Sequence, residues 1–148
     1  MRAVVQRVSA ARVSVGERPV GAIRRGLLVL VGIAPADTVA EADWLLDKLL
    51  DLRIFENELG KFDKSLREVH GELLLVSQFT LFADTRKGRR PSFTAAARPE
   101  HAVRLYEHLQ QRARAQGITV ASGEFGAHMQ VTLTNDGPVT ILLDSNER

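Results

Sequence analysis

The chain has 148 residues, of which 45% are hydrophobic, 26% are charged and none is cysteine. A domain of this length buries about 68–70% of its unfolded surface, so residues 1–148 are expected to form a single domain. The lack of cysteine excludes a disulfide scaffold, a thiolate zinc site, an iron–sulfur cluster and a cysteine nucleophile. No apolar run approaches the roughly 20 residues of a membrane span, and the N-terminal segment lacks the apolar region of a signal peptide. We therefore expect a cytoplasmic protein.

The charge is balanced in total but uneven along the chain. The net charge of +2 comes from 20 basic and 18 acidic residues, which does not mark the whole chain as a nucleic-acid binder. The first 25 residues hold six arginines and one acid, whereas residues 37–72 hold ten acids and five basic residues. A short basic cluster follows, formed by Arg86, Lys87, Arg89 and Arg90. Sixteen of the 20 cations are arginine, which suits bidentate phosphate contacts, although a GC-rich genome would explain the same preference.

Alternating hydrophobicity in the N-terminal third predicts β-strands, and an apolar run between two glycines predicts a buried strand. These strands are expected at Ala3–Val8, Arg12–Val15, Arg18–Ile23 and Gly26–Gly32. A helix follows, because Thr38 and Glu41 have the spacing of a capping box. An apolar stripe at helical spacing comes directly after it, formed by Ala42, Leu45, Leu46, Leu49 and Leu50.

The rest of the chain alternates strands with a second helix. This helix is expected to begin near Pro99 and to end at Gly117. A long polar loop at 83–97 is typical of functional or mobile segments. The expected strands are Arg53–Phe55, Leu73–Phe79, Ile118–Ala121, Met129–Thr134 and Val139–Leu143, with a turn at 58–61. The order predicts an α/β fold with a mixed sheet and two helices packed on it.

The histidines and the short motifs leave few classes of chemistry open. His70, His101, His108 and His128 show no metal-ligand spacing, so no metal or other cofactor is expected. His101 and His108 lie off the apolar stripe of the second helix and are predicted to be solvated. No phosphate-binding loop, dinucleotide fingerprint or GxSxG elbow is present.

Two short segments carry polar groups at places where ligands are commonly bound. Ser77-Gln78-Phe79-Thr80-Leu81 ends a buried strand, where side chains often meet a ligand. A nucleophilic Ser or Thr needs an adjacent base, which this segment lacks, and its hydroxyls would equally serve to satisfy the backbone. Asn135-Asp136-Gly137-Pro138-Val139-Thr140 is strong turn chemistry, and a plain hairpin explains it. A cis Gly137–Pro138 bond would instead aim two consecutive carbonyls in one direction.

Together these segments match the SQFTL and NxGPxT motifs, and the sequence resembles the D-aminoacyl-tRNA deacylase family. The resemblance runs from the N-terminal Met-Arg-Ala-Val-Val-Gln-Arg to the strand after Thr140. It also includes Arg53-Ile-Phe, Ala83-Asp84, Arg90-Pro-Ser-Phe93 and Met129-Gln-Val. It implies a partial-barrel fold of the D-aminoacyl-tRNA deacylase type, a homodimer with its active site at the subunit interface, and no expected binding to DNA or membrane. The implied reaction is hydrolysis of the ester that joins a D-amino acid to the terminal ribose of tRNA, so the implied partner is the acceptor end of an aminoacyl-tRNA.

The resemblance also implies roles for individual residues. Gly137 and Pro138 would form a cis Gly–Pro element whose carbonyls reach into the partner subunit's pocket and capture the substrate's α-amino group. L-amino acids would be rejected by their side chains, whereas glycine would escape rejection, so glycyl-tRNA is an expected substrate. Met129, Asn135 and Thr140 would line or complete this substrate site. Arg7 would support the Gly–Pro element, and the basic cluster would meet acceptor-stem phosphates.

Two mechanisms remain open at the sequence level. In one, Thr80 attacks the ester carbonyl. In the other, which we favour, the 2′-hydroxyl of the RNA assists while Thr80 and the backbone N–H groups near Phe79 and Thr80 stabilise the oxyanion. Gln78 and Ser77 would contact the carbonyl or the ribose. A non-catalytic nucleic-acid-binding dimer and a general esterase are the alternatives from other classes.

Overall fold

The computed structural model describes residues 1–148 and is organised around one long strand, β1 (Arg2–Val15). Along one edge of β1, the first half pairs with β3 (Gly26–Gly32) and the second half pairs with β2 (Arg18–Ile23). The other edge pairs with β8 (Gln130–Asp144), and all three strands are antiparallel to β1. The strands predicted at Ala3–Val8 and Arg12–Val15 are therefore one strand. Pairing with β8 continues through Ala10, where the prediction placed a break.

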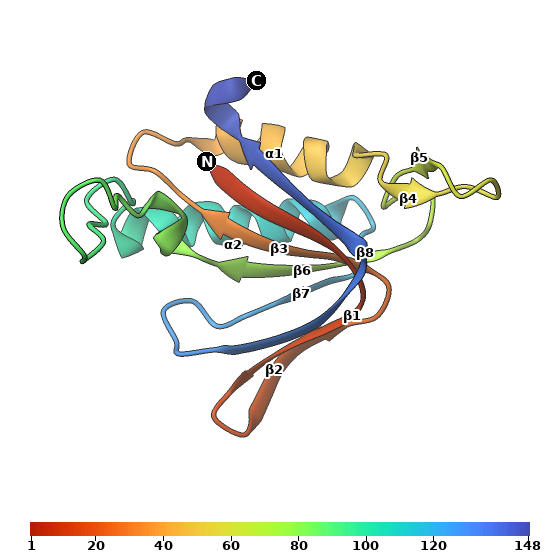
Figure 1. The fold of residues 1–148 in the computed structure, drawn as a ribbon, viewed down its shortest axis with the longest axis horizontal. Helices are drawn as coiled ribbons and strands as arrows, with labels where there is room; N and C mark the ends of the chain where they lie inside the picture. The colour runs from red at the N-terminus through yellow and green to blue at the C-terminus, as the bar shows by residue number, and fades with distance from the viewer.

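The other half of the sheet is parallel. β6 (Glu72–Ser77) lies beside β3, and β7 (Val120–Ser122) lies beside β6. Parallel neighbours need long crossovers, which α1 (Val39–Asp51) and α2 (Pro99–Ala115) supply (Figure 1). β2 contacts β7, and a Cβ on Gly21 would lie 2.6 Å from the Ser122 carbonyl oxygen. Glycine thus lets the sheet curl until it is nearly closed, and the predicted mixed α/β class is confirmed.

Apolar side chains form one core cluster on each face of this curled sheet. The larger cluster joins both helices to the face that carries Val5, Leu27 and Leu73. The smaller one fills the inside of the curl around Val13 and Leu74. The predicted stripe of α1 is buried along its whole length, and its capping box is present. Helix periodicity therefore located the main core before any tertiary contact was known.

Several elements end at different residues from those predicted. The strand expected to reach Phe79 stops at Ser77, and a 3-10 helix, η1 (Phe79–Phe82), follows it. The strand expected at Arg53–Phe55 is β4 (Phe55–Glu56), which forms a hairpin with the unpredicted β5 (Phe62–Lys64). The loop at 83–97 is drawn together by a bridge between Asp84 and Ser92. A second 3-10 helix, η2 (Ser145–Glu147), ends the chain, and none of the helices combines the length and apolarity of a membrane span.

The prediction of a hairpin around Asn135–Pro138 is wrong. The segments predicted as separate strands, Met129–Thr134 and Val139–Leu143, belong to the single strand β8, which pairs with β1 on both sides of the turn residues. Turn chemistry here makes an outward bulge in a continuous strand, because β1 supplies a partner before and after it.

Candidate functional site

A cavity of about 430 Å³ opens at the carboxyl ends of the parallel strands β3 and β6. Val31 and Ile33 reach it from the end of β3, and Ser77, Gln78 and Phe79 reach it from the end of β6. Ligands in sheets with parallel strands commonly bind at this edge. Most of the other lining side chains are apolar, namely Phe93, Ala96, Ala97, Pro99, Ala102 and Phe125. Ser77 and Gln78 of the SQFTL segment therefore form the polar wall of a largely apolar cavity, whereas Thr80 and Leu81 do not line it.

The backbone of this wall is held in place by the sheet. The amide N–H of Gln78 donates to the carbonyl oxygen of Val31 at 2.8 Å, which extends the strand pairing by one residue. η1 then begins, and the first-turn N–H groups of a helix have no acceptor within that helix. The N–H groups of Phe79 and Thr80 therefore have no acceptor within η1 and are free to donate to another group. The side-chain amide of Gln78 donates to the Thr80 hydroxyl, so these two predicted residues are brought together.

Aromatic rings form the opposite walls. The Phe79 ring, 58% exposed, meets the Phe93 ring edge-on, with centroids 5.1 Å apart. Phe125 packs on the buried ring of Tyr106, whose hydroxyl donates to the Leu75 carbonyl at 2.7 Å. Burial raises the pKa of Tyr106 to about 12, so the phenol stays protonated and keeps this hydrogen bond at neutral pH. The wall at Phe125 therefore rests on a fixed group of the core.

The second motif forms the bulge in β8. Gln6 pairs with Thr140 and Val8 pairs with Asn135, so the four residues 136–139 lie opposite Arg7 alone. The Gly137–Pro138 peptide bond within them is cis, as the resemblance led us to expect. Gly137 has φ +153°, and a Cβ there would lie 2.7 Å from the Val139 nitrogen. Gly137 and Pro138 are both exposed, so the bulge presents its backbone outward.

Three predicted residues hold the bulge from behind. Arg7 is only 5% exposed, and its guanidinium donates to the carbonyl oxygens of Asp136 at 2.8 Å and Ile54 at 2.7 Å. The Asn135 side chain accepts from the Val139 N–H at 2.7 Å and donates to the Val139 carbonyl and the Thr140 hydroxyl, each at 3.1 Å. Asn135 and Thr140 are therefore engaged in bracing the bulge rather than lining the cavity.

The cavity and the bulge lie far apart in the fold. Arg7, beside the bulge, pairs with Leu27, which pairs with Leu73, four residues before Ser77. At about 3.3 Å per residue, the four residues span roughly 13 Å along the strands. At about 4.8 Å per strand, the three steps from β8 through β1 and β3 to β6 span roughly 14 Å across the sheet. In Figure 1 the segment after β6, coloured green, lies at the left, and the β4–β5 hairpin, which contacts Arg7, lies at the right. The two motifs do not meet within one chain.

The remaining predicted residues lie outside the cavity. Met129 is half-buried and packs on the smaller core cluster inside the curl. In the basic cluster, both carboxylate oxygens of Asp84 bind Arg86, at 2.9 and 2.7 Å, and this ion pair lowers the pKa of Asp84. Lys87, Arg89 and Arg90 are exposed and pair with no carboxylate. They are the free cations of this loop.

Sequence reasoning missed the cavity residues that come from other segments, among them Phe93, Arg98, Ala102 and Phe125. Phe93 lies within one of the segments that carry the resemblance, and Ala102 lies on the apolar stripe of α2. Arg98 and Phe125 carried no local signal, because only the crossover from β6 to β7 and the segment after β7 bring them to the end of β6.

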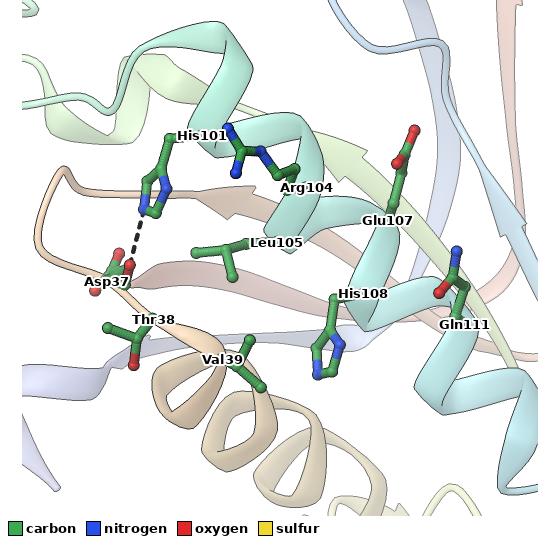
Figure 2. A pocket seen from close by; sticks show the side chains of 9 residues that line it. All are labelled: Asp37, Thr38, Val39, His101, Arg104, Leu105, Glu107, His108 and Gln111. Atoms are coloured by element: carbon green, nitrogen blue, oxygen red, sulfur yellow. Dashed lines mark hydrogen bonds between the residues drawn. The ribbon is translucent and has the colours of Figure 1, made fainter.

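A second cavity, of about 510 Å³, lies between the start of α1 and the exposed side of α2 (Figure 2). It holds no motif residue, and its two histidines contact groups at the start of α1. Nε2 of His101 lies 2.8 Å from the Asp37 carbonyl oxygen, and Nε2 of His108 lies 2.7 Å from an Asp43 carboxylate oxygen. The prediction that these histidines are solvated is wrong, because both are half-buried and link α2 to the start of α1.

Comparison with known proteins gives one consistent description. A family model described as D-Tyr-tRNA(Tyr) deacylase matches residues 4–144. A protein of Clostridioides difficile (strain 630) named D-aminoacyl-tRNA deacylase is 57% identical over 147 residues, which cover 99% of each chain. A Thermus aquaticus protein of the same name is 53% identical over 148 residues, covering 100% of this chain and 97% of its own.

Two solved structures share the fold. The structure of a protein named c-Myc DNA Unwinding Element Binding Protein superposes with a TM-score of 0.90 at 44% identity, over 97% of this chain and 98% of that one. A probable eukaryotic D-amino acid tRNA deacylase superposes with a TM-score of 0.80 at 20% identity, over 96% and 97% of the chains. The second likeness supports the fold alone.

Proposed function

Since the chain belongs to the D-Tyr-tRNA(Tyr) deacylase family, we propose that it hydrolyses the ester bond of D-aminoacyl-tRNA and releases free D-amino acid and tRNA. The observation that carries this proposal is the polar wall of the cavity together with the start of η1, where the N–H groups of the lining residue Phe79 and of its neighbour Thr80 have no acceptor within η1. Paired amides of this kind stabilise the oxyanion of a tetrahedral intermediate in acyl transfer. The aromatic walls suit the flat base of the terminal nucleoside.

We infer that the active site is completed by a second copy of the chain. The cavity of one protomer lacks a chiral filter, because the exposed Gly137–Pro138 bulge lies elsewhere in the fold and does not line it. In a two-fold dimer each bulge enters the partner's cavity, and two equivalent sites form. The outward carbonyls of the bulge then bind the α-ammonium group of the substrate.

In this arrangement chirality is read by exclusion. With the ammonium and the ester fixed, a D-side chain points away from the bulge and an L-side chain points into it. Arg7 and Asn135 keep the bulge from yielding, because they hold its backbone by hydrogen bonds to Asp136 and Val139. The hydroxyl of Thr140 in turn accepts a hydrogen bond from the Asn135 side chain. Glycine has no side chain to exclude, so glycyl-tRNA is a substrate as well.

The chemistry proceeds without a protein nucleophile. Among the cavity residues only Arg98 carries a formal charge, and a guanidinium does not take up protons at neutral pH. Thr80 therefore has no base beside it, as covalent catalysis would require. The neighbouring 2′-hydroxyl of the ribose assists the attack, and the protein positions the ester and stabilises the oxyanion. Thr80→Ala accordingly keeps substantial activity, which removes the covalent route, whereas complete loss of hydrolysis with intact fold and tRNA binding would overturn the route through the 2′-hydroxyl.

The basic cluster binds the acceptor stem in this proposal. Lys87, Arg89 and Arg90 are free to contact phosphates, whereas Arg86 is neutralised by Asp84. Replacing the three free cations by glutamine raises KM and flattens its dependence on salt. The matched Arg86→Gln variant has the smaller effect, and an unchanged salt dependence in the triple variant would overturn this role.

One assay tests the proposed function against its alternatives. The protein is incubated with D-tyrosyl-tRNA and, separately, with L-tyrosyl-tRNA, and the remaining ester is measured over time. Selective loss of the D-form supports the proposal, whereas loss of both forms indicates a general esterase. Binding without turnover indicates a nucleic-acid-binding module, the class to which the name of one structural relative points.

A further inference from the structure

Arg98 is the one charged side chain at the cavity that contains the SQFTL segment. The other lining residues are apolar, or carry neutral polar groups as in Ser77 and Gln78. Nine of the sixteen arginines form ion pairs with carboxylates, and Arg98 is not among them. The charge of Arg98 is therefore unpaired, and it is the one charge among the residues that line the cavity.

The backbone of Arg98 is fixed between the sheet and α2. The preceding residue, Ala97, donates its N–H to the Ile33 carbonyl at 2.8 Å. The carbonyl of Arg98 accepts from the N–H groups of His101 at 3.1 Å and Ala102 at 3.0 Å, which makes it the N-cap of α2. Arg98 thus has a fixed backbone, and it is exposed at the cavity that it lines.

We propose that Arg98 binds the phosphodiester on the 5′ side of the terminal adenosine of the substrate tRNA. The proposal rests on the function proposed above, which places the ester at the amides of Phe79 and Thr80. The nucleoside then occupies the cavity between that wall and the aromatic rings. Its 5′ phosphate is the nearest anion that every aminoacyl-tRNA carries, and the guanidinium fork matches two phosphate oxygens.

The charge of the aminoacyl group favours the same assignment. The α-ammonium of the substrate is positive and is repelled by a nearby guanidinium. Arg98 thus favours the orientation in which the ammonium points toward the partner's bulge and the phosphate points toward α2. A carboxylate on the substrate amino acid is the competing anion, but only acidic amino acids supply it.

The test compares three D-tyrosyl esters: that of tRNA and those of 5′-AMP and adenosine, both esterified at the 3′-hydroxyl of the ribose. The first two carry the 5′ phosphate and the third does not, so the two small esters differ in the phosphate alone. We expect Arg98→Gln to raise KM about tenfold for the first two, consistent with loss of a charged hydrogen bond, with little change in kcat. KM for the adenosine ester stays within about twofold. Arg98→Lys, which keeps the charge but loses the fork, gives an intermediate KM.

Arg104→Gln is the matched control, because Arg104 is an exposed arginine of α2 that lines the polar groove in Figure 2 and not this cavity. It leaves KM unchanged for all three esters. Salt dependence gives a second readout, since removal of one phosphate contact lowers the slope of log KM against log salt by about 0.7 for a single strand.

Two results would overturn the proposal. Equal weakening of all three esters would assign Arg98 a structural role. Unchanged kinetics would remove it from the site. If the wild-type protein hydrolyses none of the esters, the proposed function fails instead. Calorimetric binding of 5′-AMP and adenosine then still decides the matter, because tighter binding of 5′-AMP that disappears in Arg98→Gln shows the phosphate contact by itself.

Discussion

The cavity end and the bulge end of this molecule are built in opposite ways. At the cavity, two parallel strands stop side by side, the crossover after β6 supplies Phe93, and the segment after β7 supplies Phe125. Main-chain topology makes this site, and apolar side chains fill in its walls. At the bulge, β8 departs from regular pairing, and the side chains of Arg7 and Asn135 hold the departure in place.

This difference predicts where each end is fragile. A cavity defined by strand ends tolerates changes of single side chains unless they occupy its volume. A bulge held by a few hydrogen bonds depends on each of them, because a buried donor or acceptor left without its partner costs free energy. The following experiments test this contrast, beginning with the largest expected effect.

The largest effect is expected when either end is blocked, and mixing the two blocked chains distinguishes a shared site from a local one. Ala102→Trp fills the cavity, and Gly137→Ala places a Cβ within 2.7 Å of Val139 at a φ of +153°. Each variant alone loses more than about a hundredfold in deacylation rate, the size of effect that misplacement of a reacting group produces. After subunit exchange, half of the dimers are mixed, and each holds one intact site, so about a quarter of the wild-type activity returns.

Native mass spectrometry confirms that the mixed dimers form, and each variant mixed with itself is the control. Recovery in the mixture supports a site shared between subunits. No recovery despite mixed dimers would contradict the arrangement and place the whole site in one chain.

A smaller effect is expected when the support of the bulge is weakened. Arg7→Lys keeps the charge but cannot reach both the Asp136 and Ile54 carbonyls with one fork. We expect the free energy of unfolding to fall by about 2 kcal/mol and the rate ratio of D- to L-tyrosyl-tRNA to decrease. Denaturant titration and the two-substrate assay measure these changes. Arg12→Lys, an exposed position on the same strand, is the matched control, and equal stability of the two variants would show that Arg7 does not brace the bulge.

The smallest effect is expected at the start of α1, away from both ends. Hydrogen bonds from the hydroxyl and backbone N–H of Thr38 lower the pKa of Glu41 to about 2. Because this pKa is lower in the folded chain than the ordinary 4.5, the stabilisation is complete above about pH 4.5 and is lost as the pH falls toward 2. Glu41→Gln costs about 1 kcal/mol at pH 7 and nothing measurable at pH 2.

Urea unfolding at the two pH values measures the difference, and deacylation at neutral pH is unchanged because Glu41 touches neither motif. If Glu41→Gln lowers the free energy of unfolding equally at both pH values, the negative charge of Glu41 does not contribute to the capping of α1.

Local patterns predicted the parts of this protein that depend on near neighbours in the chain. The stripe from Ala42 to Leu50 and the Thr38 cap define α1, since helix periodicity and capping involve residues only three or four apart. The alternation in β1 and the apolar run of β3 likewise predicted the centre of the sheet. The two motifs could be recognised from their residues, because their sequences are distinctive whatever they contact.

What a strand or a turn becomes depends on partners that are distant in the chain. Asn135–Pro138 has the residues of a hairpin, yet β1 lies beside it before and after, so the strand continues and the turn becomes a bulge. Arg7 has the local sequence of an ordinary strand arginine, but the bulge carbonyl and Ile54 bury it.

The sequence by itself determined the fold class, the helices and the two motifs, because these are encoded by neighbouring residues. Only the tertiary structure decided that the two motifs lie far apart in the folded chain. It also decided that Phe93, Arg98 and Phe125 share the cavity with the first motif. Those positions follow from the register of the sheet and the path of its crossovers, which are set by the burial of both faces of the sheet together and by no single segment.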